Sequence, residues 1–199
     1  MHYQPEKNDH GLPHSPFLAL VAPRPIGWIS TISPAGVVNL APYSFFNAVS
    51  SRPPMVMFAS SAPKDSQGNA EASGEFVANL ATYDLREAVV ETSRPIGAHL
   101  SEPETIGLAM TASRYVKTPR VARAHAALEC RYLKTVELHD HAGKRVSSSV
   151  VFGEVVGVFI DDALIVEGLV DLSQARPLAR LGYKDYATLA EIFAMAVHG

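Results

Sequence analysis

Two short segments carry side chains that could bind a small ligand, and the first of them spans residues 60–69. It reads Ser-Ser-Ala-Pro-Lys-Asp-Ser-Gln-Gly-Asn, so three serines and a lysine fall within seven residues. Asp65 or Ser66 can cap a helix that starts here, and Gly74 can end it. Hydroxyls, a cation and the N–H groups of a helix start together suit a phosphate monoester, provided that Asp65 caps the helix rather than facing the anion. The segment therefore indicates a phosphate site, although it contains neither a Walker loop nor a Gly-x-Gly-x-x-Gly motif.

The second segment spans residues 39–50 and reads Asn-Leu-Ala-Pro-Tyr-Ser-Phe-Phe-Asn-Ala-Val-Ser. It leaves a predicted strand and turns at a proline. A flat heteroaromatic ring needs N–H donors, an amide or hydroxyl, and apolar faces, and this stretch supplies all three. The same residues also fit a strand-to-loop junction whose Asn and Ser side chains satisfy local backbone groups. Composition alone favours the junction.

The remaining polar candidates point less clearly to chemistry. His139 and His141 have the spacing of metal ligands, but they lie in a predicted polar turn without a third ligand, so we expect solvated side chains and no metal site. Cys130 is the only cysteine, which excludes an intramolecular disulfide, and its apolar surroundings predict a buried, inert thiol. Arg24 and Arg52 each adjoin a proline and fit a ligand contact or a packing role equally well.

The elements that must position these residues follow from apolar periodicity and turn residues. We expect strands over residues 26–33, 37–42, 55–60, 75–80, 127–138 and 147–160. We expect helices between residues 65 and 74, over 83–91, after Pro103, and over 186–197. Because several strands adjoin in sequence without regular helical crossovers, a doubly wound parallel sheet is disfavoured. The pattern favours an antiparallel β-barrel with small helices around it.

Length and composition set broad limits on the class of protein. The 199 residues fit one domain over 15–199, preceded by a polar arm over 1–14. Hydrophobic residues make up 47% and charged residues 19%, as in ordinary globular proteins. The net charge of −3, without a stripe of Lys and Arg, disfavours nucleic acid as a partner. Neither a signal peptide nor a membrane span is recognisable, so we expect a soluble, cytoplasmic protein without a membrane partner.

Taken in order, five segments resemble the flavin reductase-like, FMN-binding split-barrel family, which includes flavoredoxins and the small reductase components of two-component monooxygenases. They are residues 23–31, residues 36–46, Lys64-Asp65-Ser66 with Asn69, residues 119–130 and residues 180–187. Each motif alone is modest, but five in the right order are specific. The resemblance implies a mainly β fold, a six-stranded antiparallel Greek-key split barrel with peripheral helices. It also implies a homodimer with FMN near the subunit interface.

The resemblance also implies a set of site residues, and it reverses the preference for a simple junction at residues 39–44. Ser66 stands where the family commonly has threonine and retains the hydroxyl. Tyr183 and Tyr186 are expected near the open face of the flavin. The residues expected along the isoalloxazine and ribityl chain are Thr31, Asn39, Ala41, Pro42, Tyr43 and Ser44. Those expected around the phosphate are Ser60, Ser61, Lys64, Asp65, Ser66 and Asn69.

The implied function is that of an oxidoreductase in which NADH or NADPH passes hydride to non-covalently bound FMN. The flavin then carries the chemistry, so no protein acid–base pair is required. The alternative is a flavoredoxin-like carrier that takes electrons from a protein partner and does not turn over a nicotinamide. An oxygenase or another redox protein is a possible electron acceptor. Residues 94–123 form a long irregular stretch that could serve as a lid or a dimer contact.

Overall fold

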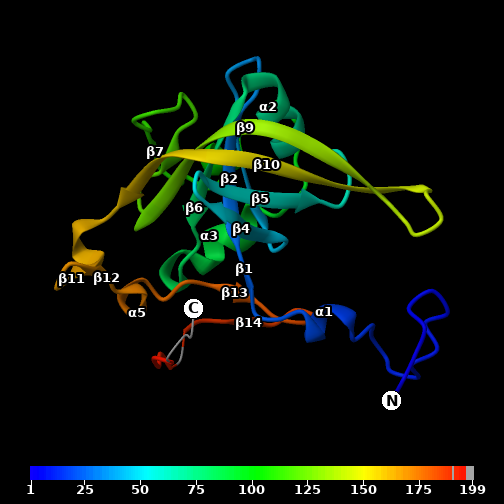
Figure 1. Ribbon diagram of the computed structural model, residues 1–199. Helices are drawn as coiled ribbons and strands as arrows, with labels where there is room; N and C mark the ends of the chain where they lie inside the picture. Colours follow the sequence, from blue (N-terminus) through cyan, green and yellow to red (C-terminus); the bar gives the residue numbers. More distant parts are fainter. Residues whose placement is uncertain (190, 196–199) are drawn as a thin grey trace.

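The computed structural model describes residues 1–189 and 191–195 (Figure 1). Its main sheet has seven strands, and every neighbouring pair is antiparallel. From one edge to the other the strands are β3 (Val38–Tyr43), β2 (Gly27–Ile32), β6 (Glu75–Leu80), β9 (Ala126–His139), β10 (Arg145–Ile160), β5 (Pro54–Ser60) and β4 (Phe46–Ser51). The β9–β10 pair forms a long hairpin whose turn projects away from the rest of the sheet.

The two edges of this sheet, β3 and β4, are joined by only two residues, Ser44 and Phe45. In a flat seven-stranded sheet the edges would lie roughly 29 Å apart, because neighbouring strands are about 4.8 Å apart. The chain from Tyr43 to Phe46 can span only about 10 Å. The sheet must therefore curl until its edges approach, yet β3 and β4 do not pair. The result is an open antiparallel barrel with a split at Ser44, which confirms the predicted fold class.

Smaller elements surround the barrel. The helices are α1 (Phe17–Leu20), α2 (Asp65–Ser73), η1 (Tyr83–Leu85), α3 (Arg86–Glu91), α4 (Glu102–Thr105), η2 (Asp162–Leu164) and α5 (Leu172–Ala175). The short strands are β1 (Arg24–Pro25), β7 (Met110–Thr111), β8 (Arg120–Val121), β11 (Ile165–Val166), β12 (Leu169–Val170), β13 (Ala179–Arg180) and β14 (Tyr186–Ala187). A three-stranded sheet of β1, β13 and β14 joins the start of the domain to its end (Figure 1). None of the helices described is long and apolar enough to cross a membrane.

The six predicted strands are confirmed within two residues at each end, and the differences lie elsewhere. The main sheet contains a seventh strand, β4, whose pairing with β5 shifts register between Ala48 and Ser50. Such a bulge interrupts alternation, so periodicity gave no sign of this strand. The helix predicted for residues 186–197 is wrong over its described part. Tyr186 and Ala187 pair with β13 instead, and residues 188, 189 and 191–195 are not helical; residues 190, 196 and 197 lie outside the described residues.

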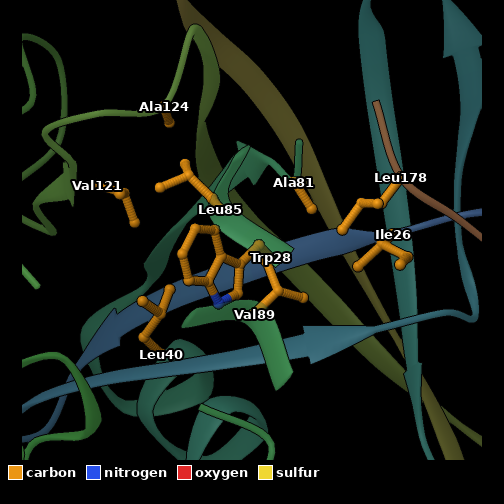
Figure 2. Packing of buried hydrophobic residues seen from close by; sticks show 9 residues of the cluster. All are labelled: Ile26, Trp28, Leu40, Ala81, Leu85, Val89, Val121, Ala124 and Leu178. Carbon is orange, nitrogen blue, oxygen red and sulfur yellow. The ribbon is translucent and has the colours of Figure 1, made fainter. Parts of the chain in front are cut away.

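One core cluster is centred on Trp28, which is fully buried in β2. Figure 2 shows its indole ring among the side chains of Leu40, Leu85, Val89 and other apolar residues from separate elements. The indole Nε1–H donates to Thr92 Oγ1 at 2.9 Å. This buried bond anchors Thr92, just after α3, to the barrel core.

A second cluster fills the barrel between β5, β6 and β9. The rings of Tyr43, Phe58 and Phe76 contact one another in sequence, with centroids 4.8 and 5.3 Å apart. Cys130 is fully buried in the same cluster, as predicted, and burial raises the pKa of its thiol. Gly27 is required for close packing, because a Cβ there would lie 2.4 Å from the Phe46 ring. Glycine at this position lets β4 approach β2 near the split.

Candidate functional site

A cavity of about 380 Å³ opens beside the split, where β3, the start of α2 and the segment after α3 meet. Seven of the twelve residues predicted to bind FMN line it, so the fold brings the two predicted segments together. The full lining comprises Asn39, Ala41, Pro42, Tyr43, Pro63, Lys64, Asp65, Ser66, Thr92, Ser93, Arg94, Pro95, Ile96 and Glu102. We call this space the phosphate-end cavity.

The start of α2 lies at this cavity, and the first N–H groups of a helix have no partner within the helix. Lys64 occupies the N-cap position with extended backbone angles, and no side chain caps the helix. The prediction that Asp65 or Ser66 caps is therefore wrong, because the residue at the cap is a lysine without an acceptor oxygen. Asp65 lies in the first turn, and Gly74 ends the helix with φ of 74° as predicted. An uncapped helix start beside a lysine is suited to an oxyanion.

Tyr43 lines the same cavity and is buried, yet its hydroxyl has no hydrogen-bond partner among the described residues. Ser60 and Ser66 lie close to the hydroxyl without the geometry of a hydrogen bond. Burial raises the pKa of Tyr43, so the phenol keeps its proton and can donate it. A buried unpartnered hydroxyl costs free energy, and a ligand oxygen in the cavity would satisfy it.

Glu102 reaches the cavity from α4, inside the long loop of residues 94–123. Its Oε2 accepts a hydrogen bond from the Leu40 N–H at 3.0 Å. In the amide orientation that matches the neighbouring donors and acceptors, the Asn39 nitrogen donates to Glu102 Oε1 at 3.3 Å. The Asn39 oxygen then accepts from Ser66 Oγ at 2.8 Å. Burial raises the pKa of Glu102, and nearby Asp65 acts in the same direction. The hydrogen bond from Leu40 acts in the opposite direction, but burial has the larger effect.

Five predicted phosphate or ring residues are not among those that line this cavity, and one of them, Ser44, lines a neighbouring cavity. Thr31 is buried, and its Oγ1 accepts from Asn69 Nδ2 at 3.2 Å. Ser60 is also buried, and its hydroxyl donates to the Ala62 carbonyl. Ser61 is exposed. Their predicted contacts with FMN remain predictions.

A second cavity of about 310 Å³ adjoins the first and shares Pro42 and Ser93 with it. The predicted residue Ser44 lines this space together with Tyr183 and Tyr186, the two tyrosines expected near the open face. Its lining comprises Leu18, Arg24, Ile26, Pro42, Ser44, Phe45, Ser93, Arg180, Leu181, Tyr183 and Tyr186. We call it the arginine-lined cavity.

Sequence reasoning missed the segment of residues 92–96 and Glu102 as parts of the site. The long loop was noted only for its length. The position of Thr92 depends on its bond to Trp28, 64 residues away in sequence, and no local pattern signals that contact. His139 and His141 lie exposed at the tip of the β9–β10 hairpin. In the part of the chain that the structure describes, no group of three or more His, Cys, Asp or Glu side chains could hold a metal ion.

An open antiparallel barrel with an anion-suited cavity at its split places the chain among the split-barrel proteins. More specifically, the chain belongs to the flavin reductase-like domain family, whose model matches residues 20–177. It is 37% identical over 175 residues to an uncharacterised protein of Aquifex aeolicus, covering 85% of this chain and 86% of that protein. That relative confirms the family and gives no activity.

Solved structures agree with this assignment. Nitrilotriacetate monooxygenase component B from Bacillus cereus superposes with a TM-score of 0.89 and 26% identity over 98% of both chains. The 2-nitrobenzoate 2-nitroreductase of Pseudomonas fluorescens gives a TM-score of 0.86 and 27% identity, covering 100% of this chain and 96% of that one. The flavoredoxin of Desulfovibrio vulgaris (Miyazaki F) has a TM-score of 0.75 at 17% identity, covering 87% and 91%, and shares the fold.

Proposed function

We propose that this chain binds FMN non-covalently and acts as an FMN-dependent oxidoreductase. The observation that carries the proposal is the phosphate-end cavity, where an uncapped helix start, Lys64 and the unpartnered Tyr43 hydroxyl converge. These are one cation and several N–H and O–H donors, which is the donor set that a phosphate monoester requires. The same cavity lies in a chain of the flavin reductase-like family.

The phosphate would be held by Lys64, Ser66 and the first N–H groups of α2. Arg94 adds a second cation at the rim, although it is exposed and paired with Glu91 at 3.0 Å. Exposed ion pairs contribute little, so Arg94 can exchange this partner for a phosphate at small cost. Asn39 and Glu102 offer polar groups to ribityl hydroxyls.

The ring would extend past Pro42 toward Ser44 at the split, because Pro42 lines both cavities. Bound FMN supplies the transfer of electrons or hydride, and the protein supplies position and electrostatics. Phe45, Tyr183 and Tyr186 line the arginine-lined cavity, where their rings would lie beside the flavin.

We propose NADH or NADPH as the electron donor and the arginine-lined cavity as the place where it meets the flavin. The similarity to a monooxygenase component and to a nitroreductase supports an oxidoreductase role. An electron-accepting oxygenase or redox protein remains the proposed partner. A homodimer is supported by apolar side chains left exposed on the β9–β10 hairpin, among them Leu133, Val136 and Val158.

The decisive experiment is a visible absorption titration of the purified chain with FMN, followed by anaerobic addition of NADH and of NADPH. We expect the flavin bands to shift on binding and to bleach with one or both nucleotides. Bleaching only with a chemical reductant would contradict nicotinamide turnover and favour the carrier. Unchanged flavin bands, with no binding by equilibrium dialysis, would overturn the proposal.

A further inference from the structure

Arg24 and Arg180 lie directly opposite one another across the antiparallel pair of β1 and β13. Like charges in this arrangement destabilise a sheet, so the pair requires compensation. In the described part of the chain, neither arginine forms an ion pair with a carboxylate. Both line the arginine-lined cavity, whose described lining contains no Asp or Glu. Two positive charges therefore face one cavity without a protein counter-ion.

Arg24 is fixed in place and cannot move away from its neighbour. It is only 7% exposed, and its guanidinium donates to the carbonyls of Leu18, Val21 and Leu181. Carbonyl oxygens satisfy donors, but they do not neutralise the charge. Its buried Nε has no partner among the described residues. Burial and the charge of Arg180 both lower the pKa of Arg24, as expected for a cation held without a counter-ion.

Arg180 is the member of the pair that can reach a ligand. Its Nη2 donates to the Tyr183 carbonyl, and its guanidinium lies over the Tyr186 ring, 4.5 Å from the centroid. These contacts leave other N–H groups of the Arg180 guanidinium available to bind an oxyanion. The rings of Phe45, Tyr183 and Tyr186 line the same space and suit a flat organic molecule.

We propose that the arginine-lined cavity binds the oxyanion of a planar organic molecule next to the proposed flavin site. Arg180 is the direct partner of that carboxylate or phosphate, and buried Arg24 supplies a fixed second charge. The placement of this ligand beside the flavin rests on the proposed function. The oxyanion has two sources, a small aromatic carboxylic acid or the phosphate of a nicotinamide nucleotide.

The proposal can be tested by calorimetry on the full chain, with and without FMN. The three probes are benzoate, benzamide and nicotinamide mononucleotide. Benzamide matches benzoate in shape but lacks the charge. We expect benzoate or the mononucleotide to bind at least tenfold more tightly than benzamide, and more weakly at high salt. Binding of benzoate alone identifies the carboxylic acid, and binding of the mononucleotide alone identifies the nucleotide. The proposal is overturned if neither anion binds, or if neither anion binds more tightly than benzamide.

Variants assign the binding to the cavity. Arg180→Gln should weaken binding of the anionic probe at least tenfold, and Arg180→Lys should weaken it less because the charge remains. Arg123→Gln is the matched control, since Arg123 pairs with Asp84 and is not among the residues that line this cavity. Equal affinities in Arg180→Gln and wild type would overturn the assignment. The flavin-free measurement separates the two proposals, because it does not depend on FMN binding.

Discussion

The two adjoining cavities are built in opposite ways. The phosphate-end cavity takes almost all of its lining from three short segments, and it sets Lys64 and Arg94 against two carboxyl groups, Asp65 and Glu102. The arginine-lined cavity combines residues more than 150 positions apart in sequence, and its described lining holds two arginines without a carboxylate. In the first cavity, carboxyl groups of the protein partly balance the positive side chains that would bind one anion. In the second cavity, only a bound anion would balance the charges of the two arginines.

The largest effect is expected from the core around Trp28, which supports Thr92 at the first cavity and includes Ile26 of the second. Trp28→Ala should lower the free energy of unfolding by about 3–5 kcal/mol, because it empties the centre of the cluster in Figure 2. It also removes the bond that holds Thr92 at the phosphate-end cavity. Urea unfolding measures the change, with Phe17→Ala as control because Phe17 is 56% exposed. Equal losses in the two variants would contradict the role assigned to this core.

Lys64→Ala separates the two cavities. It should weaken FMN binding by about 1–3 kcal/mol, the cost of losing a charge-assisted hydrogen bond. Binding of the anionic probe to the flavin-free protein should stay unchanged, since Lys64 does not line the arginine-lined cavity. Flavin absorbance and calorimetry measure the two affinities, and Lys144→Ala in the exposed hairpin turn is the control. An unaltered FMN affinity in Lys64→Ala would contradict the assignment of the FMN phosphate to the phosphate-end cavity.

Tyr43→Phe tests whether the unpartnered hydroxyl is reserved for a ligand. Without FMN the variant should be as stable as wild type or slightly more stable, because a buried unsatisfied group is removed. FMN affinity should fall by about 0.5–1.5 kcal/mol, the scale of one neutral hydrogen bond. Tyr132→Phe is the matched control, since the Tyr132 hydroxyl donates to Thr135 at 3.1 Å and its loss should destabilise the free protein. Thermal unfolding with and without FMN distinguishes these outcomes.

The smallest effect concerns pH and Glu102. Its pKa is raised in the folded chain, so the folded state binds its proton more tightly than the unfolded state does. This contribution to stability is complete below the ordinary glutamate pKa and is lost as the pH rises through the raised one. Urea unfolding over a pH series should therefore show a decline in wild type that Glu102→Gln lacks. Glu104→Gln, an exposed change on the same helix, should retain the decline; identical profiles in all three would count against the assignment.

Much of the barrel was predictable because its signals are local. The six predicted strands are bounded by Pro, Gly and polar turns, and β6 has the predicted bounds of residues 75–80. Strand β4 and the ends of the chain were not predictable in this way. Their backbone conformation depends on partners distant in sequence, as when Tyr186 pairs with Arg180 rather than entering the helix that its apolar spacing indicated. Pairing across a sheet satisfies backbone groups that periodicity cannot account for.

The same division applies to the site. By itself the sequence determined which residue types are available for a phosphate, the hydroxyls and Lys64 of residues 60–69, because they adjoin a helix start within one short segment. Only the tertiary structure decided that Tyr43 has an unpartnered hydroxyl there and that Glu102 faces it from a distant loop. It alone set Arg24 opposite Arg180. Burial, pKa shifts and charge balance depend on neighbours in space. Those neighbours are determined only when the sheet curls and the two ends of the domain pair through β1 and β13.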